Sequence, residues 1–188
     1  MSGLKAAVAV FALLPVALGA QAPPVEVTPA EILQRVAAAV TPEVEFSEAR
    51  TAKLLKAPLV SSGRLRYQAG GRLERETREP AAELVIIDGR QVTIERAGTK
   101  TELSLIAGSP QYALVQALRA VLGGQLKELE PVYRATAEGS LDRWRLHLEP
   151  REAGGAVRAV RLSGSDGLVG EIEVLERNGD KTVTNLTR

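Results

Sequence analysis

Hydrophobic and polar residues alternate along most of the chain after residue 43, a pattern typical of β-strands with one solvated and one buried face. The alternation is clearest over Arg143–Glu149, where Trp144, Leu146 and Leu148 share one face. Turn sequences such as Asp88-Gly89 separate the segments at short intervals and favour tight hairpins. The pattern predicts about eleven antiparallel strands in a meander. Their expected ranges are 43–54, 57–68, 72–78, 81–87, 91–96, 100–105, 131–138, 141–149, 156–163, 167–176 and 180–187.

Two segments carry helical spacing instead. In the first, Thr28 is a candidate N-cap, Pro29 takes the first helical position, and Glu31 completes a capping box. The second begins at Ser109-Pro110 and ends near Gly123-Gly124. Residues 125–130 are expected to form a connector or a further short helical turn. The candidate lid residues on the apolar stripes of the two helices are Ile32, Leu33, Val36, Leu114, Leu118 and Val121.

The apolar faces of so many strands must be covered or closed. One interpretation is that helices and sheet pack into an ordinary core. The other is that the sheet curves around a cavity and the helices form its lid. Composition leaves both open, although the low aromatic content of 3% makes the buried surface mainly aliphatic. The residues that could line a cavity are Leu65, Tyr67, Leu73, Ile86, Val92, Ile94, Leu103, Leu105, Trp144, Leu146, Leu148, Ile172 and Val174.

The N-terminus has the form of an export signal. Lys5 precedes the uncharged apolar run Ala6–Leu18, which is short for a membrane span, and small residues follow. We expect residues 1–20 to be a signal peptide, with cleavage between residues 19 and 22, and residues 21–188 to form one soluble domain. The chain contains no cysteine, which excludes disulfides, thiol catalysis and a lipid-modified N-terminal cysteine.

The charge pattern and the candidate chemistry argue against several classes of function. Removing residues 1–20 takes away Lys5 and no acidic residue, so 24 basic and 23 acidic residues become 23 of each. A neutral chain with mixed signs gives no long-range attraction for nucleic acid. The single histidine, His147, lies on the polar face of its strand, and no nucleophile elbow, phosphate loop or metal-ligand spacing accompanies it. We expect no catalytic residue, no metal and no cofactor.

Several segments, in order along the chain, resemble the LolA family of periplasmic outer-membrane lipoprotein carriers. They are Phe46–Arg50, Pro58–Tyr67, Gly71–Thr77, Pro80–Ile94, Trp144–Pro150 and Arg161–Glu173. The resemblance implies an unclosed half β-barrel of about eleven antiparallel strands, with a helical lid over an apolar cavity for acyl chains. The fold class expected is thus mainly β with two to three helices. The implied function is a monomeric periplasmic carrier whose cargo is a lipidated protein or an acyl lipid.

The resemblance also implies two membrane partners, an inner-membrane exporter and an outer-membrane acceptor. The sequence departs from the family in two respects. Ala69-Gly70-Gly71 stands where LolA has an Arg-Pro pair whose arginine helps to latch the lid. The role of that arginine therefore cannot be assigned to a residue of this chain. The chain also ends at Arg188, close to its last predicted strand, whereas LolA proper extends further. Both departures indicate a divergent member. The alternatives are a periplasmic sensor or regulator that uses this half-barrel to bind a partner protein and, less favoured, a periplasmic enzyme.

Overall fold

The computed structural model describes residues 27–39, 42–68, 70–106, 110–152 and 154–188. Within these residues the helices are Pro29–Ala38 (α1), Pro110–Gly123 (α2) and Leu126–Leu129 (α3). The strands are Glu43–Thr51 (β1), Leu59–Gln68 (β2), Arg72–Glu79 (β3), Glu83–Asp88 (β4), Gln91–Arg96 (β5), Thr99–Ser104 (β6), Tyr133–Ser140 (β7), Arg143–Pro150 (β8), Val157–Ser165 (β9), Leu168–Glu176 (β10) and Lys181–Thr187 (β11).

All eleven strands form one antiparallel sheet in the order β6-β5-β4-β3-β2-β1-β11-β10-β9-β8-β7. Strand β1 pairs with both β2 and β11, so it joins the two halves of the sheet in its middle. Strands β6 and β7 are the edges of this sheet and are not neighbours in it, so the barrel is not closed. The predicted fold class, mainly β with an unclosed half-barrel and helices, is confirmed.

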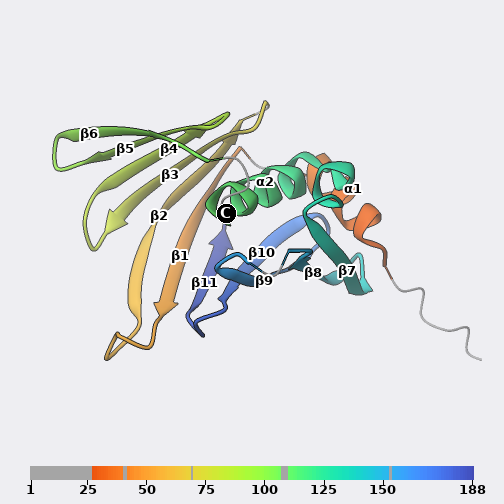
Figure 1. Cartoon of the computed structure of the whole chain (residues 1–188). Coiled ribbons are helices and arrows are strands. Elements are labelled where there is room, and N and C mark those ends of the chain that lie inside the picture. Colours follow the sequence, from red (N-terminus) through yellow and green to blue (C-terminus); the bar gives the residue numbers. More distant parts are fainter. Residues whose placement is uncertain (1–26, 40–41, 69, 107–109, 153) are drawn as a thin grey trace, which may run out of the picture.

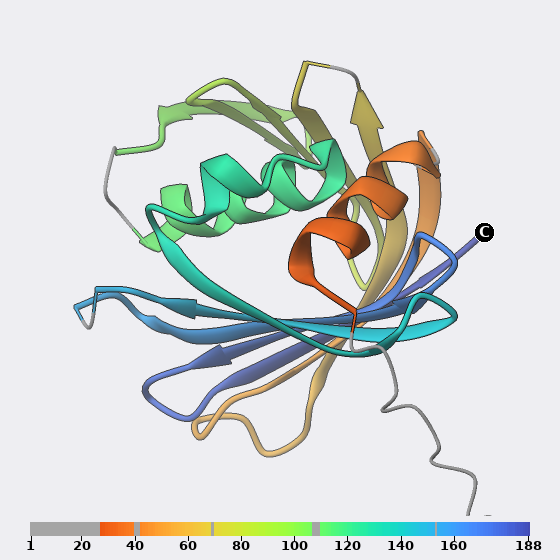
Figure 2. The ribbon, with the colours of Figure 1, turned by 90° about the vertical axis from the view of Figure 1, so that its right-hand side faces the viewer.

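The helices lie inside the curve of the sheet. Figure 1 shows α1 and α2 between the two halves, and Figure 2 shows the sheet curling around them, with β2–β6 on one side and β7–β11 on the other. In this arrangement the apolar stripes of the helices and the apolar inner face of the sheet cover each other. Among the described residues, no helix has the length and apolarity needed to cross a membrane.

Helix α1 begins as the sequence predicts. The Glu31 backbone N–H donates to the Thr28 hydroxyl at 3.3 Å, and the Thr28 backbone N–H donates to the Glu31 carboxylate at 2.8 Å. These bonds satisfy groups that a helix start otherwise leaves unpaired, which fixes where α1 begins. Residues Ile32, Leu33 and Val36 of this helix are buried.

The main core lies between the helices and the β7–β10 half of the sheet. Trp144, Leu146 and Leu148 on β8 are fully buried there, together with Val121 of α2. A Cβ at Gly164 of the neighbouring strand β9 would lie 2.5 Å from a Trp144 ring carbon, so the indole requires a glycine beside it. A second, smaller cluster lies on the other half of the sheet, where the residues packed together include Val92, Leu105 and Val115.

The sequence predicts the element order of this fold correctly, and the strand limits only approximately. The first strand ends at Thr51 instead of 54, because the chain turns there and the Leu55 N–H donates to the Ala52 carbonyl at 2.9 Å. The expected connector contains α3, a single helical turn. The predicted signal peptide and its cleavage site lie outside the described residues.

Candidate functional site

An apolar cavity of about 560 Å³ lies between the helices and the inner face of the sheet. Its walls come from both halves of the sheet and from both longer helices, so residues far apart in sequence share one space. The aliphatic residues that line it are Val36, Ala39, Val44, Leu65, Leu73, Val85, Ile87, Leu118, Val121, Leu122, Leu162, Leu168, Val169, Ile172 and Leu186. Tyr67 is the aromatic residue in this wall.

The helices are held over this cavity by close backbone contacts. Gly167, in the β9–β10 turn, has a φ of 82° and lies directly against the Arg35 carbonyl and Ala39 at the end of α1. A side chain at position 167 would be strained by this φ and would collide with the helix. The turn can therefore approach α1 closely enough to place Ala39 and Leu168 in the same wall of the cavity.

An arginine of α2 ties the helix to the turns of the β2–β5 half of the sheet. The Arg119 guanidinium donates to the backbone carbonyl of Gly71 at 2.6 Å, of Gly89 at 2.7 Å and of Ile87 at 3.3 Å. Three bonds from one fork-shaped cation hold a helix more firmly than a single point charge would. Residue Arg119 follows Leu118, so the tie is adjacent to the cavity wall. Residue Ala69, where LolA carries its latch arginine, lies outside the described residues.

Four charged residues also contribute to the wall of the cavity: Arg66, Glu74, Arg75 and Arg188. The Arg75 guanidinium, on β3, donates to Glu48 at 2.9 Å, to Ser61 at 3.2 Å and to Thr77 at 2.9 Å. The same group lies 4.5 Å from the centre of the Phe46 ring, within cation–π range. Glu48 therefore offsets the charge of Arg75, and Glu74 lies 3.5 Å from Arg66, so these two cations of the wall are paired within the protein.

The chain was then compared with known proteins. Residues 21–188 match a family described as outer membrane lipoprotein carrier protein LolA-like. The chain belongs to this family. The resemblance identified in the sequence is therefore confirmed, and the chain is a divergent LolA-like protein.

Solved structures similar to this LolA-like chain are distant from it in sequence. A LolA superfamily protein from Nitrosomonas europaea shares 12% identity and a TM-score of 0.46, over 86% of this chain and 92% of that one. LprF from Mycobacterium bovis shares 12% identity with a TM-score of 0.39, over 85% and 91% of the two chains. The MucA/MucB complex of Pseudomonas aeruginosa matches at 15% identity and a TM-score of 0.43, over 85% of this chain and 55% of that one. No curated protein sequence matches.

The sequence-predicted lining residues separate into three groups in this LolA-like chain. Those in the cavity wall are Leu65, Tyr67, Leu73 and Ile172, with Val36, Leu118 and Val121 from the predicted lid. Those packed into or against the two cores are Trp144, Leu146, Leu148, Val174, Ile32, Leu33, Val92, Ile94 and Leu105. The side chain of Leu114 lies outside the described residues. Contact of the first group with an acyl chain stays a prediction.

Two predicted lining residues lie elsewhere. Ile86 alternates with Val85 and Ile87, which face the cavity, so its side chain lies on the outer face, in a hollow that it shares with Arg72 and Asp88. Four consecutive apolar residues precede Asp88, and such a run gives no period from which the inner face can be chosen. Leu103 pairs with Val92 and therefore lies on the inner face of the sheet. It belongs to the edge strand β6, however, and is 43% exposed.

Sequence reasoning missed several members of the wall. Val85 and Ile87 belong to the ambiguous run on β4. Leu122 shares the predicted apolar stripe of α2 but is not among the candidate lid residues. Leu168 and Val169 follow the β9–β10 turn, and nothing in their spacing indicates that this turn packs against a helix. Arg75, two residues after Leu73, lies on the inner face opposite Leu65 and Val85, and it was not among the predicted lining residues.

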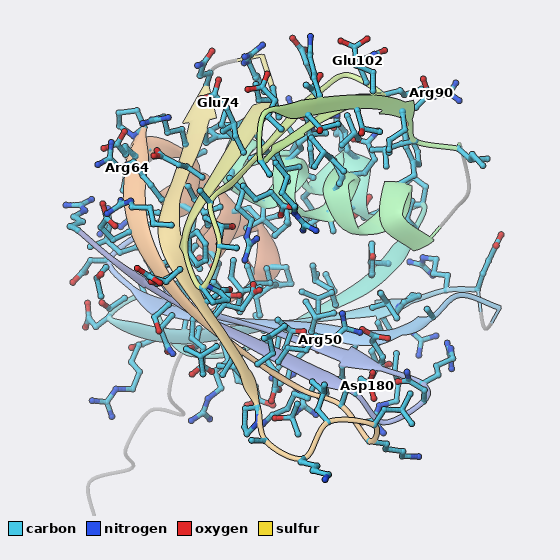
Figure 3. All side chains as sticks on the ribbon, turned by 90° about the vertical axis from the view of Figure 1, so that its left-hand side faces the viewer. Arg50, Arg64, Glu74, Arg90, Glu102 and Asp180 are labelled. Carbon is cyan, nitrogen blue, oxygen red and sulfur yellow. The ribbon has the colours of Figure 1, made fainter. Side chains whose placement is uncertain are left out.

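The outer face of the sheet carries cross-strand ion pairs. Arg66 lies 2.6 Å from Glu43, and Arg78 lies 2.7 Å from Glu45, whose pKa is lowered by the hydrogen bond from Arg78. Arg64 and Glu74, on this face, and Glu102, on the edge strand β6, are labelled in Figure 3. A further hollow of about 670 Å³ over β3–β6 is lined mainly by such charged residues, and this composition does not suit hydrocarbon.

The described residues also locate the one histidine. The His147 imidazole lies on the outer face of β8, with its Nε2 3.7 Å from the Glu138 carboxylate. Its side chain is separated from the cavity by the sheet, because its neighbours Leu146 and Leu148 occupy the inner face. Among the described residues, no group of three or more histidine, aspartate or glutamate side chains is arranged to hold a metal ion.

Proposed function

We propose that this LolA-like protein is a periplasmic carrier that shields acyl chains of a lipidated protein or an acyl lipid while they cross water. The observation that carries the proposal is the aliphatic cavity between the helices and the inner face of the sheet. Two observations support the proposed periplasmic location. The chain belongs to the LolA-like family, and its N-terminus has a predicted export signal with Lys5 and the apolar run Ala6–Leu18. The proposal assigns no catalytic step to the chain.

The size of the cavity fits one long hydrocarbon chain. An engineered protein cavity of about 150 Å³ takes up benzene, or about 25 Å³ per carbon atom. On that scale a volume of about 560 Å³ has room for on the order of twenty carbons. Each methylene removed from water is worth about 0.8 kcal/mol, so ten of them contribute about 8 kcal/mol towards binding. The low aromatic content of the wall suits a flexible aliphatic ligand.

Loading and release require access to this space, and the helices control it. Leu118 and Leu122 of α2 form part of the wall, and Arg119 between them holds the helix to the carbonyls of Gly71 and Gly89. Moving α2 away from β2–β5 would break these hydrogen bonds and open that side of the cavity. In the proposed cycle an inner-membrane exporter supplies the cargo and an outer-membrane acceptor receives it.

The decisive experiment is to purify the protein from a periplasm and to analyse an organic extract of it by mass spectrometry. We expect acyl-bearing molecules in amounts approaching one per protein, and displacement of a fluorescent long-chain fatty acid by the same extract. A matched control is the variant Leu65→Arg, which places a cation in the wall of the cavity and should purify with little lipid. A protein free of lipid but bound to a partner protein would instead establish the regulatory alternative.

A further inference from the structure

The hairpin between β1 and β2 carries a cluster of exposed aliphatic side chains that the cavity does not use. Leu54 is 98% exposed, Leu55 44%, Leu59 53% and Val60 59%. Single apolar residues on a protein surface are ordinary, but four large ones within seven positions gather apolar surface at the end of the hairpin. Leu59 and Val60, consecutive on β2, extend it over both faces of the hairpin. We refer to residues 53–60 as the hairpin tip. Both views show it projecting beyond the neighbouring β10–β11 turn (Figures 1 and 2).

The tip is held in this exposed position by defined contacts. The Lys53 N–H donates to the Asp180 carboxylate at 3.3 Å, and the Leu55 N–H donates to the Ala52 carbonyl at 2.9 Å. Asp180 in turn lies 3.5 Å from Arg50, and both residues are labelled in Figure 3. The backbone on either side of Leu54 is therefore anchored to the sheet. These backbone contacts hold Leu54 in its solvent-exposed position at the tip.

The charges around the patch are positive. Lys53 and Lys56 flank Leu54 and Leu55, and both lysines are exposed. The carboxylates of the adjoining β10–β11 turn, Glu176 and Asp180, lie 3.6 and 3.5 Å from Arg50, which offsets their charge. An exposed aliphatic tip flanked by two lysines is complementary to a surface that has anionic groups outside and an apolar layer below them. Lysine stems can lie along such a boundary while their ammonium groups stay in water.

We propose that the hairpin tip inserts into the interface of a membrane that contains anionic lipids. A protein partner is less well matched, because protein interfaces are centred on tryptophan, tyrosine and arginine and are depleted in lysine, whereas the tip contains none of the first three. The tip connects the end of β1, at Thr51, to the start of β2. The cavity is lined at the other ends of the same strands by Val44 and Leu65. Docking and acyl binding are thus separable functions.

Vesicle flotation tests this proposal. The full-length mature protein is mixed with vesicles of phosphatidylethanolamine and phosphatidylglycerol, or of neutral phosphatidylcholine. We expect binding to the anionic vesicles that weakens with salt. The double variant Leu54→Ser, Leu55→Ser should bind about tenfold or more weakly, because the inserted aliphatic area is lost. Lys53→Gln with Lys56→Gln should lose the preference for anionic vesicles.

Matched controls come from other surfaces of the chain. Ile106→Ser removes an apolar side chain that is 73% exposed, and Lys127→Gln removes an exposed cation of α3. Both should bind vesicles as the unmodified protein does, and circular dichroism should show all variants folded. Failure of the unmodified protein to bind either vesicle, or equal binding by the leucine variant, would overturn the proposal. Self-association abolished by the leucine variant would assign the tip to a second copy instead.

A fluorescent fatty-acid titration of the same variants separates this proposal from the carrier function. Its affinity in solution should not change in any tip variant, because residues 53–60 do not line the cavity. Loss of probe binding by the unmodified protein would refute the carrier function while leaving the vesicle result to decide on the tip.

Discussion

A charge placed on α2 distinguishes a packed helix from one that covers a space. Leu118 is half-buried and lines the cavity, whereas Leu33 of α1 is 0% exposed, belongs to the main core and does not line the cavity. Leu118→Glu and Leu33→Glu therefore introduce the same carboxylate into two different surroundings. Leu118→Met, which conserves volume, is the control for side-chain loss alone.

The structure gives different magnitudes for the two substitutions. At position 33 the carboxylate is buried without a partner, and such a charge costs about 3–5 kcal/mol of stability. At position 118 it can be hydrated from the cavity, so the main loss is part of the burial of one leucine, about 1–2 kcal/mol. In the cavity, however, a hydrated carboxylate excludes hydrocarbon. Displacing about four methylenes costs about 3 kcal/mol of binding, or roughly 100-fold in affinity.

Denaturant unfolding and titration with a fluorescent fatty acid should be measured on all three variants. We expect Leu118→Glu to remain folded and to lose most of its binding. Leu33→Glu should be severely destabilised, and Leu118→Met should resemble the unmodified protein. Lowering the pH should restore part of the binding of Leu118→Glu, because protonation removes the introduced charge. Retained affinity in the folded Leu118→Glu variant would refute the cavity as the acyl site.

Three further predictions rest on the structure, and a fourth rests on the sequence of the N-terminus. Arg119→Lys, which keeps the charge but loses the three-carbonyl fork, should speed probe exchange several-fold in stopped flow, and unchanged exchange would show that the tie does not restrain α2. His147→Ala should leave cargo transfer within a few-fold and cost under about 1 kcal/mol in denaturant unfolding; loss by orders of magnitude in a folded variant would restore the enzyme alternative. Hydrogen bonds from Thr28 lower the pKa of Glu31, so the capping box stabilises the fold above the usual glutamate pKa and this contribution disappears as pH falls through the lowered value. Thr28→Ala should therefore lose about 1 kcal/mol at neutral pH and show a smaller further loss on acidification, measured by thermal unfolding; an unchanged acid profile would contradict this. N-terminal sequencing of exported material should find cleavage between residues 19 and 22, and a chain that still begins at residue 1 would contradict the export signal.

Much of the fold could be predicted because its signals are local. The capping box at Thr28 and Glu31 fixes the start of α1, and alternation over Arg143–Glu149 gives both the strand β8 and the buried face of Trp144. The position of the cavity is not a local property. Trp144 and Ile172 share the inner face of the sheet, yet one packs into the core and the other borders empty space, according to where the helices lie along the strands.

Charged residues show the same limit. Alternation along β3 places Arg72 with Glu74 on the outer face and Arg75 with Leu73 on the inner one. Arg75 is accommodated there because Glu48 and Thr77, also on the inner face, accept its hydrogen bonds. A partner on another strand can be located only once the register between strands is known. The arginine tie of α2 has the same character, since Arg119 bonds to backbone carbonyls that no sequence motif marks.

The place of β1 in the sheet has a consequence for how the chain folds. Strand β1 is the first strand of the chain, and it pairs along most of its length with β11, the last strand. The Thr184 hydroxyl donates to the Glu48 carboxylate across this pairing, 136 residues away in sequence. Each half of the sheet can form from local hairpins, but the seam between them closes only after the whole chain is present. Contacts of such long range slow folding. If the chain crosses a membrane N-terminus first, the edge of β1 that pairs with β11 stays unpaired until the last strand has crossed.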